Sequence, residues 1–295
     1  MKRGEEPRLR VLRPEDTEEE YTGSEEEYGA YGGEDEAPEE RIAALLEQAG
    51  RTSSVKKRQE YARAVLELDP KNLPAKLMLV MDSRDLLRML EVFDEAVQDE
   101  ENELRQEGWF ADEYIGDFWL IDETRNYMVA RFNRMKHLIV MSRFRTAAKE
   151  GEDLLRLCRG DNLGVRYLLM GLYVALEEKE ALEKLFEEYD EDGPEVLLSG
   201  AMMAYRFGET DKALSCLQQI RIPNFRPFIR AMLRGEEKET YWKEAVETRR
   251  MGGYQYNTVG HLLHIADDWD FLRPHSVPFL QWAYEAVKRP VRRKS

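Results

Sequence analysis

Two histidines and two aspartates lie close together near the C-terminus, in the segment HLLHIADD at 261–268. On a helix, His264 and Asp268 share one face, and His261 lies one turn away. Imidazole and carboxylate groups are ligands for zinc and other transition metals. Polar residues at helical spacing more often cap a helix or line a solvated face, however. We therefore expect no bound metal and no cofactor here.

A second segment, GWFADEYIGDFWLIDETRNY at 108–127, mixes aromatic side chains with acidic ones and one arginine. Aromatic residues and arginine are enriched at ligand-binding surfaces, because they combine contact area with directional hydrogen bonds. This mixture favours a binding surface. In the alternative interpretation, the aromatic residues fill an irregular junction between helix pairs, and Arg125 is paired with Asp122 or Glu123.

The sequence contains none of the short motifs that mark common catalytic sites. It has no G-x-S-x-G elbow, no Walker loop and no H-E-x-x-H segment. Gly252 and Gly253 form a loop that no predicted strand precedes, so this loop does not resemble a phosphate cradle. We therefore do not expect an enzyme.

The charge of the chain limits its partners. The formal net charge is −15 over 295 residues, with a pI of about 5.0. This argues against a nucleic-acid or anionic-membrane surface, since both require cationic side chains. Residues 1–40 hold 15 acidic and 5 basic side chains and are predicted to be a disordered acidic tail. The tail either solubilises the protein or binds a basic partner.

Cysteine usage and hydropathy indicate the compartment. Cys158 and Cys216 give neither a disulfide framework nor a zinc spacing. Both fall at apolar positions of helical patterns, which favours buried, reduced thiols. The N-terminus lacks the apolar region of a secretory signal, and no run approaches the roughly 18 apolar residues of a membrane span. We therefore expect a cytoplasmic protein with no membrane partner.

From Arg41 onward, apolar residues recur at helical spacing, and no strand-like alternation of useful length occurs. Short links between the helices imply antiparallel neighbours stacked in chain order. The predicted helices run from Ser53 or Ser54 to 68 and over 75–81, 86–104, 125–141, 144–158, 165–176, 181–189, 195–207, 211–220, 225–234, 238–246, 258–269 and 277–288.

Some of these segments carry repeat-like motifs. YARAVLELDPKN at 61–72 resembles the second helix and exit of a tetratricopeptide repeat, and FGETDKALSCL at 207–217 resembles the turn between its two helices. The Trp-x-x-Leu-Gly start of that repeat is absent. Larger blocks, at 116–128, 160–169 and 185–192, are similar to tetratricopeptide proteins grouped with the suppressor-of-tumorigenicity-seven family. That resemblance covers about residues 55–285 and implies an interaction scaffold with no established chemistry.

The resemblance is incomplete at particular positions. Its firmest matches are Glu123-Thr124-Arg125, Tyr127-Met128, and Asp161-Asn162 with Gly164, Arg166 and Tyr167. Relatives usually carry Gln where this chain has Leu163, and acidic residues where it has His261 and His264. A shared C-terminal site is therefore not carried over.

Together these observations predict an all-α fold: a right-handed stack of degenerate tetratricopeptide-like helical hairpins, or α-solenoid. We expect a disordered acidic tail over 1–40, the repeat array over 41–250, and a C-terminal helical cap with a short basic tail over 251–295. The predicted function is a non-catalytic scaffold that binds a protein or peptide in a concave groove. The alternatives are a small-molecule or metal-dependent sensor or enzyme using 108–127 or 261–268, and a regulatory module whose acidic tail mimics a polyanion.

Five residues are predicted to lie together on the concave side, because they open the first helices of adjacent pairs. Two arginines in one groove would bind a partner carboxylate, such as a peptide C-terminus. Asn162 could instead cap a helix, and Arg166 could pair with a neighbouring helix. The five predicted partner-binding residues are Trp119, Arg125, Tyr127, Asn162 and Arg166.

Overall fold

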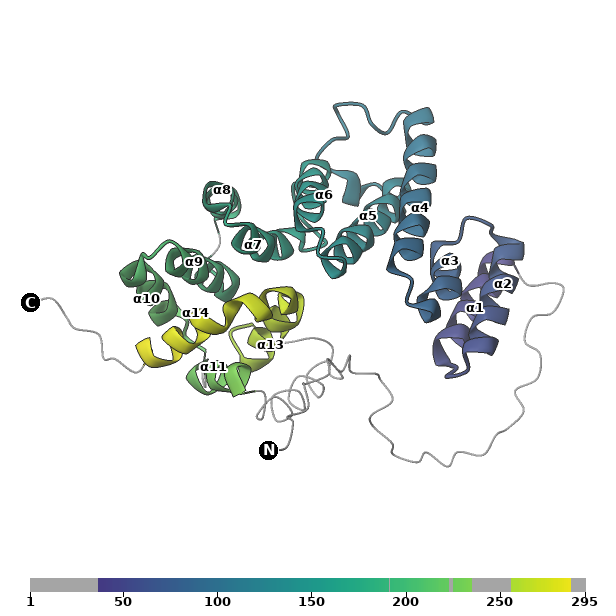
Figure 1. Cartoon of the computed structure of the whole chain (residues 1–295). Helices are drawn as coiled ribbons and strands as arrows, with labels where there is room; N and C mark the ends of the chain where they lie inside the picture. Colours follow the sequence, from purple (N-terminus) through teal and green to yellow (C-terminus); the bar gives the residue numbers. More distant parts are fainter. Residues whose placement is uncertain (1–36, 191, 223–224, 235–255, 288–295) are drawn as a thin grey trace, which may run out of the picture.

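The computed structural model describes residues 37–190, 192–222, 225–234 and 256–287 (Figure 1). This part of the chain is all-α, with 13 α-helices and no strand beyond isolated bridges of Gly116 and Asp117 to Cys158. Most of these helices pack mainly on their neighbours in the sequence, whereas α11 and α14 pack on each other. The helices are α1 (Pro38–Arg51), α2 (Val55–Leu68), α3 (Leu73–Val80), α4 (Leu86–Gln106), α5 (Asp122–Val140), α6 (Phe144–Leu157), α7 (Val165–Leu176), α8 (Lys179–Tyr189), α9 (Pro194–Arg206), α10 (Thr210–Gln219), α11 (Phe225–Arg234), α13 (Val259–Asp268) and α14 (Arg273–Ala286).

The predicted helices that fall on described residues agree closely with the observed ones, because capping residues punctuate the apolar pattern, but α1, which begins within the predicted tail, was not predicted. Ser54 accepts a hydrogen bond from the Lys57 amide at the start of α2, and Asn72 accepts one from Ala75 at the start of α3. α5 begins three residues earlier than predicted, at Asp122. Residues 1–36 and the predicted helix 238–246 lie outside the described part of the chain.

One apolar core runs through the helices from α4 to α14, and a smaller one joins α1, α2 and α3. Gly151 explains how closely the central helices pack. A Cβ atom at this position of α6 would lie 2.9 Å from the side chains of both Leu169 and Met135. The absence of a side chain therefore lets α6 contact α5 and α7 at short range.

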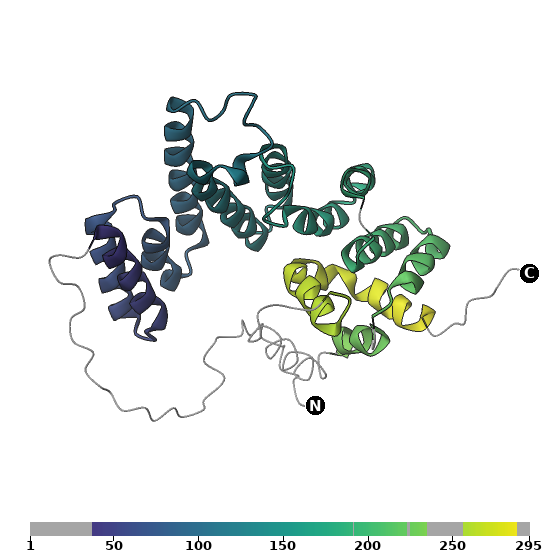
Figure 2. The same cartoon turned by 180° about the vertical axis from the view of Figure 1, so that it is seen from behind.

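The helix pairs follow one another along an arc, and α13 and α14 lie on its inner side beneath α7 and α9 (Figures 1 and 2). The Trp269 indole donates a hydrogen bond to the Tyr167 carbonyl of α7 at 2.8 Å. The ring of Tyr205 on α9 packs edge-on against Phe279 of α14, with 5.6 Å between centroids. The chain's own C-terminal helices thus fill the inner side beside α7 and α9.

None of the described helices combines the length and the apolar character that crossing a bilayer requires.

Candidate functional site

The aromatic segment between α4 and α5 is packed into the junction of these helices. Phe118 is fully buried, and Phe110 meets Phe118 and Tyr127 edge-on, with centroids 5.2 and 5.8 Å apart. The Arg105 guanidinium lies over the Phe110 ring, 4.0 Å from its centroid. The structure therefore agrees with the packing alternative: the rings fill an irregular junction, and the interleaved acidic residues are exposed.

Beneath this junction lies a buried network of charged groups. Arg131 donates to Glu150 at 2.7 Å and to Asp153 at 2.5 Å, and Arg134 donates to the other oxygen of Glu150 at 2.9 Å. The Tyr127 hydroxyl donates to Glu101 at 2.9 Å and accepts from Arg131 at 3.2 Å. Burial raises the pKa of Tyr127 well above its ordinary value. The network ties α4, α5 and α6 together.

The structure differs from the prediction for Tyr127. Its side chain is fully buried in the core, so it does not form part of an accessible surface. Arg125 is exposed: its Nε donates to the Trp119 carbonyl at 2.9 Å, and its Nη1 pairs with Asp122 at 2.5 Å. Trp119 is half-buried against the core. Arg125 and Trp119 are therefore joined at the start of α5, and Tyr127 lies beneath them.

Asn162 and Arg166 lie at the start of α7, where Asp161 rather than Asn162 caps the helix. The Asp161 carboxylate accepts from the backbone amides of Val165 and Arg166 at 2.7 and 3.0 Å. It also accepts from the Arg166 guanidinium at 2.8 Å. Asn162 is exposed, and its side chain accepts a weak hydrogen bond from the Cys158 thiol.

We expect Asp161→Ala to destabilise the protein by about 2–3 kcal/mol, because it removes a helix cap and the carboxylate that binds Arg166. Urea unfolding followed by circular dichroism measures this. The adjacent Asn162→Ala is the matched control and should change the unfolding free energy by less than about 0.5 kcal/mol. Equal effects of the two variants would contradict the assignment of the cap.

The two cysteines lie in different surroundings. Cys158 is buried, as predicted, whereas Cys216 is half-buried, and both are free thiols. Burial raises the pKa of the Cys216 thiol, which disfavours the reactive thiolate.

The two histidines of the C-terminal segment have different partners. His261 is buried: its Nε2 lies 2.5 Å from Glu195 on α9, and its Nδ1 accepts from the Asn257 amide at 3.3 Å. Because a backbone amide only donates, Nδ1 carries no proton, and Nε2–H donates to the carboxylate. His264 pairs with Asp268 at 3.5 Å. Within the described ranges, no group of three or more His, Cys, Asp or Glu side chains is arranged to hold a metal ion.

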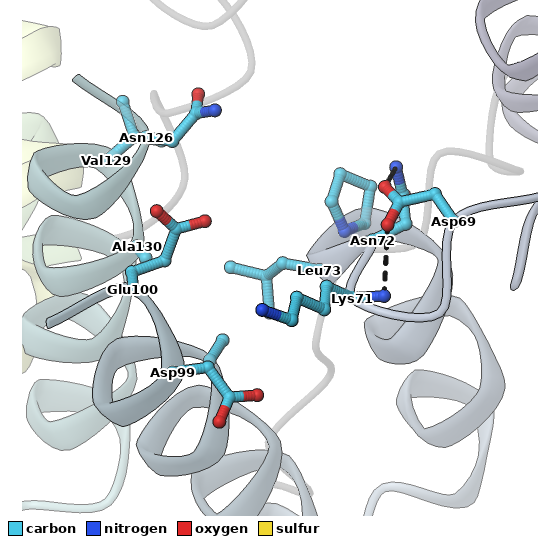
Figure 3. A pocket seen from close by; sticks show the side chains of 11 residues that line it. Asp69, Lys71, Asn72, Leu73, Asp99, Glu100, Asn126, Val129 and Ala130 are labelled. Atoms are coloured by element: carbon cyan, nitrogen blue, oxygen red, sulfur yellow. Dashed lines mark hydrogen bonds between the residues drawn. The ribbon is translucent and has the colours of Figure 1, made fainter. Parts of the chain in front are cut away.

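An open pocket of about 450 Å³ lies between the turn before α3, the middle of α4 and the first half of α5 (Figure 3). Glu100 and Asn126 project into it from α4 and α5, opposite Leu73 and Lys71. We name it the acidic pocket. Its lining residues are Asp69, Lys71, Asn72, Leu73, Pro74, Ala96, Asp99, Glu100, Asn126, Val129 and Ala130.

The charges in the acidic pocket are unbalanced. The Lys71 ammonium, its single cation, forms an ion pair with Glu103 outside the pocket. Asp69 accepts hydrogen bonds from the turn that follows it. Asp99 and Glu100 take no hydrogen bond or ion pair within the described part of the chain. Burial, together with the nearby charge of Glu103, raises the pKa of Glu100, and the Lys71 ammonium offsets only part of that rise.

Sequence reasoning did not identify Asp99 and Glu100, because they lie in the acidic run QDEENE, which is typical of a solvated helix face. No motif marks them. Only the tertiary contact of α4 with α5 and the turn before α3 separates the half-buried Glu100 from exposed neighbours such as Asp99.

A second pocket, of about 640 Å³, lies where the end of α5 approaches the C-terminal helices. The 3-10 helix η3 (Asp270–Leu272) and the start of α14 form its far wall. We name it the apolar pocket. Its lining residues are Lys136, Ile139, Val140, Ser142, Phe144, Leu168, Asp267, Asp268, Asp270, Phe271, Arg273, Pro274 and His275.

Comparisons with known proteins do not assign the chain to a family. No family model matches it, and neither a curated protein nor a solved structure matches it. The interpretation of the two pockets therefore depends on their own geometry and charge.

Proposed function

We propose that this protein is a non-catalytic, tetratricopeptide-like helical scaffold that binds a protein or peptide segment on the inner side of its arc. The sequential antiparallel pairs support this, and so does the contact of α7 with α9 as well as with α8. In right-handed helical-repeat arrays, successive first helices touch in this way and form the concave surface. The repeat-like motif at 61–72 falls on α2 and its exit.

We expect the ligand to bind near α3, α4 and α5, where the C-terminal helices do not cover the array. α13 and α14 occupy the inner side beside α7 and α9, whereas the acidic pocket among α3, α4 and α5 is open to solvent. The observation that carries the proposal is Glu100, a half-buried carboxylate that forms no hydrogen bond or ion pair within the described residues and whose nearest cation, Lys71, is paired with Glu103. Partial burial of an unpaired charge costs stability, and a cation supplied by a ligand would offset that cost.

The proposed ligand group is therefore the basic side chain of a lysine or arginine. This differs from the partner carboxylate that Arg125 and Arg166 were predicted to bind. Arg125 is paired with Asp122, and Arg166 with Asp161, so both cations already have a carboxylate. The alternative sensor or enzyme has less support, because the rings of 108–127 are packed together and His261 is bonded to Glu195.

A random 12-residue peptide display library, selected on the full chain, tests this function. We expect the selected peptides to be enriched in lysine or arginine. Glu100→Gln should weaken their binding about tenfold, which corresponds to about 1.4 kcal/mol. Glu95→Gln is the matched control: Glu95 is an exposed residue of the same helix outside the pocket. Peptides without basic enrichment, or equal binding by the two variants, would contradict the proposal.

Although the Glu100 carboxylate should favour ligand binding, it should lower the stability of the free protein. Because the pKa of Glu100 is raised in the folded protein, the folded state holds this proton more tightly than the unfolded chain. Glu100 therefore disfavours folding above its raised pKa, and this cost disappears as the pH falls toward the ordinary carboxyl range. At pH 7, Glu100→Gln should stabilise the free protein by less than about 1 kcal/mol.

Thermal melts of the wild type and Glu100→Gln between pH 4 and pH 7 measure this effect. The difference in melting temperature should be largest at pH 7 and should shrink toward pH 4. A Glu100→Gln variant that is less stable than the wild type at pH 7 would show that the carboxylate has a stabilising partner.

A further inference from the structure

The exposed side of α5 forms one continuous stripe. Asn126, Val129, Asn133, Lys136 and Val140 are spaced by three and four residues, so they share one face of the helix. Val129 and Val140 are 39% and 65% exposed, an unusual position for apolar side chains in an otherwise well-packed helix. This face, which we name the α5 stripe, is the open one, whereas the opposite face is buried against α4 and α6.

The α5 stripe connects the two pockets. Asn126 and Val129 line the acidic pocket, and Lys136 and Val140 line the apolar pocket. At about 1.5 Å rise per residue, Asn126 and Val140 are about 21 Å apart along the helix axis. The apolar pocket also includes residues of η3 and α14. The Lys136–Val140 end of the stripe therefore lies beside the C-terminal helices.

The apolar pocket has the chemistry of a site for a large apolar side chain. Aliphatic and aromatic side chains form about half of its lining, and the rings of Phe144 and Phe271 pack against each other there, with 5.3 Å between centroids. Carboxylates of Asp267, Asp268 and Asp270 lie at its C-terminal wall. Aromatic and aliphatic anchors in such pockets contribute much of the affinity of peptide interfaces. Three carboxylates outnumber the two cations of the pocket, Lys136 and Arg273, and this small excess of negative charge favours a basic rather than an acidic partner.

The two asparagines of the stripe indicate the conformation of the ligand. The side-chain amides of Asn126 and Asn133 take no hydrogen bond within the described residues. Each amide offers donors and an acceptor. The backbone of an extended peptide has unpaired N–H and C=O groups, whereas a helix satisfies its own. An extended ligand therefore complements the α5 stripe better than a helical one.

We propose that the α5 stripe is the floor of one groove that binds an extended segment of a partner protein at two points. A lysine or arginine of the segment enters the acidic pocket, and a large apolar side chain enters the apolar pocket. At about 3.3 Å per residue, a span of about 21 Å separates these two side chains by about six residues. This inference rests on the proposed function and adds the second pocket and the spacing.

The peptides selected from the 12-residue library provide the test. We expect them to carry a basic residue and a large apolar residue about six positions apart. In fluorescence anisotropy with the full chain, replacing either residue by alanine should weaken binding about tenfold. Inserting two glycines between them should cause a similar loss, because both side chains then no longer reach their pockets together.

Protein variants assign each side chain to its pocket. Val140→Lys should weaken the selected peptide about tenfold but should have little further effect on the peptide that lacks the apolar residue. Val277→Lys is the control, because Val277 is also an exposed valine, 43% exposed, and lines neither pocket. In the same way, Glu100→Gln should weaken the selected peptide about tenfold but should have little further effect on the peptide that lacks the basic residue.

The outcomes separate the two proposals. Basic peptides that depend on Glu100 but tolerate Val140→Lys and the glycine insertion would overturn the two-point groove and leave the proposed function standing. Selection of no peptide, or of peptides indifferent to Glu100, would overturn both.

Discussion

Glu150→Ala is expected to destabilise the protein by about 3–5 kcal/mol, the usual cost of removing one partner from a buried ion pair. Glu150 is 8% exposed, and its two oxygens bind Arg131 and Arg134 of α5. The alanine variant leaves each arginine with one carboxylate that is more exposed, Asp153 for Arg131 and Asp94 for Arg134, and Arg131 is itself buried. Because α5 carries the proposed groove, the variant should also lose peptide binding at temperatures where it begins to unfold.

Two controls separate charge burial from other effects at this interface. Glu150→Gln keeps most of the shape and a hydrogen-bond acceptor, so its loss should be smaller than that of Glu150→Ala. Arg145→Ala, on the same helix, breaks the exposed pair with Glu178 and should cost at most about 1 kcal/mol. Urea unfolding measures all three. A loss below about 1 kcal/mol for Glu150→Ala would show that water reaches the network.

The second large effect concerns the C-terminal helices. Trp269→Ala should cost about 3–5 kcal/mol, as is usual for a buried aromatic residue. Trp269 is 5% exposed and bonds to the Tyr167 carbonyl. It covers Gly171 of α7 so closely that a Cβ atom there would lie 2.8 Å from the indole. Loss of the indole should loosen α13 and η3 from the inner side beside α7.

Gly171→Ala tests this packing independently, because the contact with Trp269 decides whether the substitution raises or lowers the free energy of unfolding. An alanine in a helix is normally more stable than a glycine by about 1 kcal/mol. Gly171→Ala should instead destabilise, because its methyl group meets Trp269, whereas Gly50→Ala in α1, with nothing within 4 Å, should stabilise. In a Trp269→Ala background, Gly171→Ala should become stabilising. A stabilising Gly171→Ala in the wild type would mean that Trp269 does not lie there.

Helix positions were predictable from local features of the sequence. The predicted segments 165–176 and 225–234 coincide with α7 and α11, because apolar residues repeat there at helical spacing and the flanking turns interrupt them. Asp161 was not recognised as a cap, since its neighbour Asn162 has equal capping propensity. The choice between them depends on backbone geometry: Asp161 adopts a φ of 45° before the helix.

The candidate site was much less predictable, because it is formed by tertiary contacts. The aromatic-acidic mixture around Tyr127 suggested a ligand surface, but the rings turn inward and the carboxylates outward, so the mixture reflects a packed junction. Glu100 lies on α4 and Val129 on α5. In the sequence, both resemble ordinary surface positions. Nothing in the pattern indicated that α13 and α14 fold back beside α7 and α9 and so leave α5 as the open part of the inner side.

Methyl NMR of the full chain with the selected peptide tests the proposed groove most directly. Val129 and Val140 lie at opposite ends of the α5 stripe, whereas Val165 and Val174 are buried in α7 and serve as internal references. Single valine-to-isoleucine variants would assign the four signals. Saturating peptide should shift the methyl signals of both Val129 and Val140 and leave those of Val165 and Val174 in place. Binding that leaves Val129 and Val140 unshifted would contradict a groove along α5.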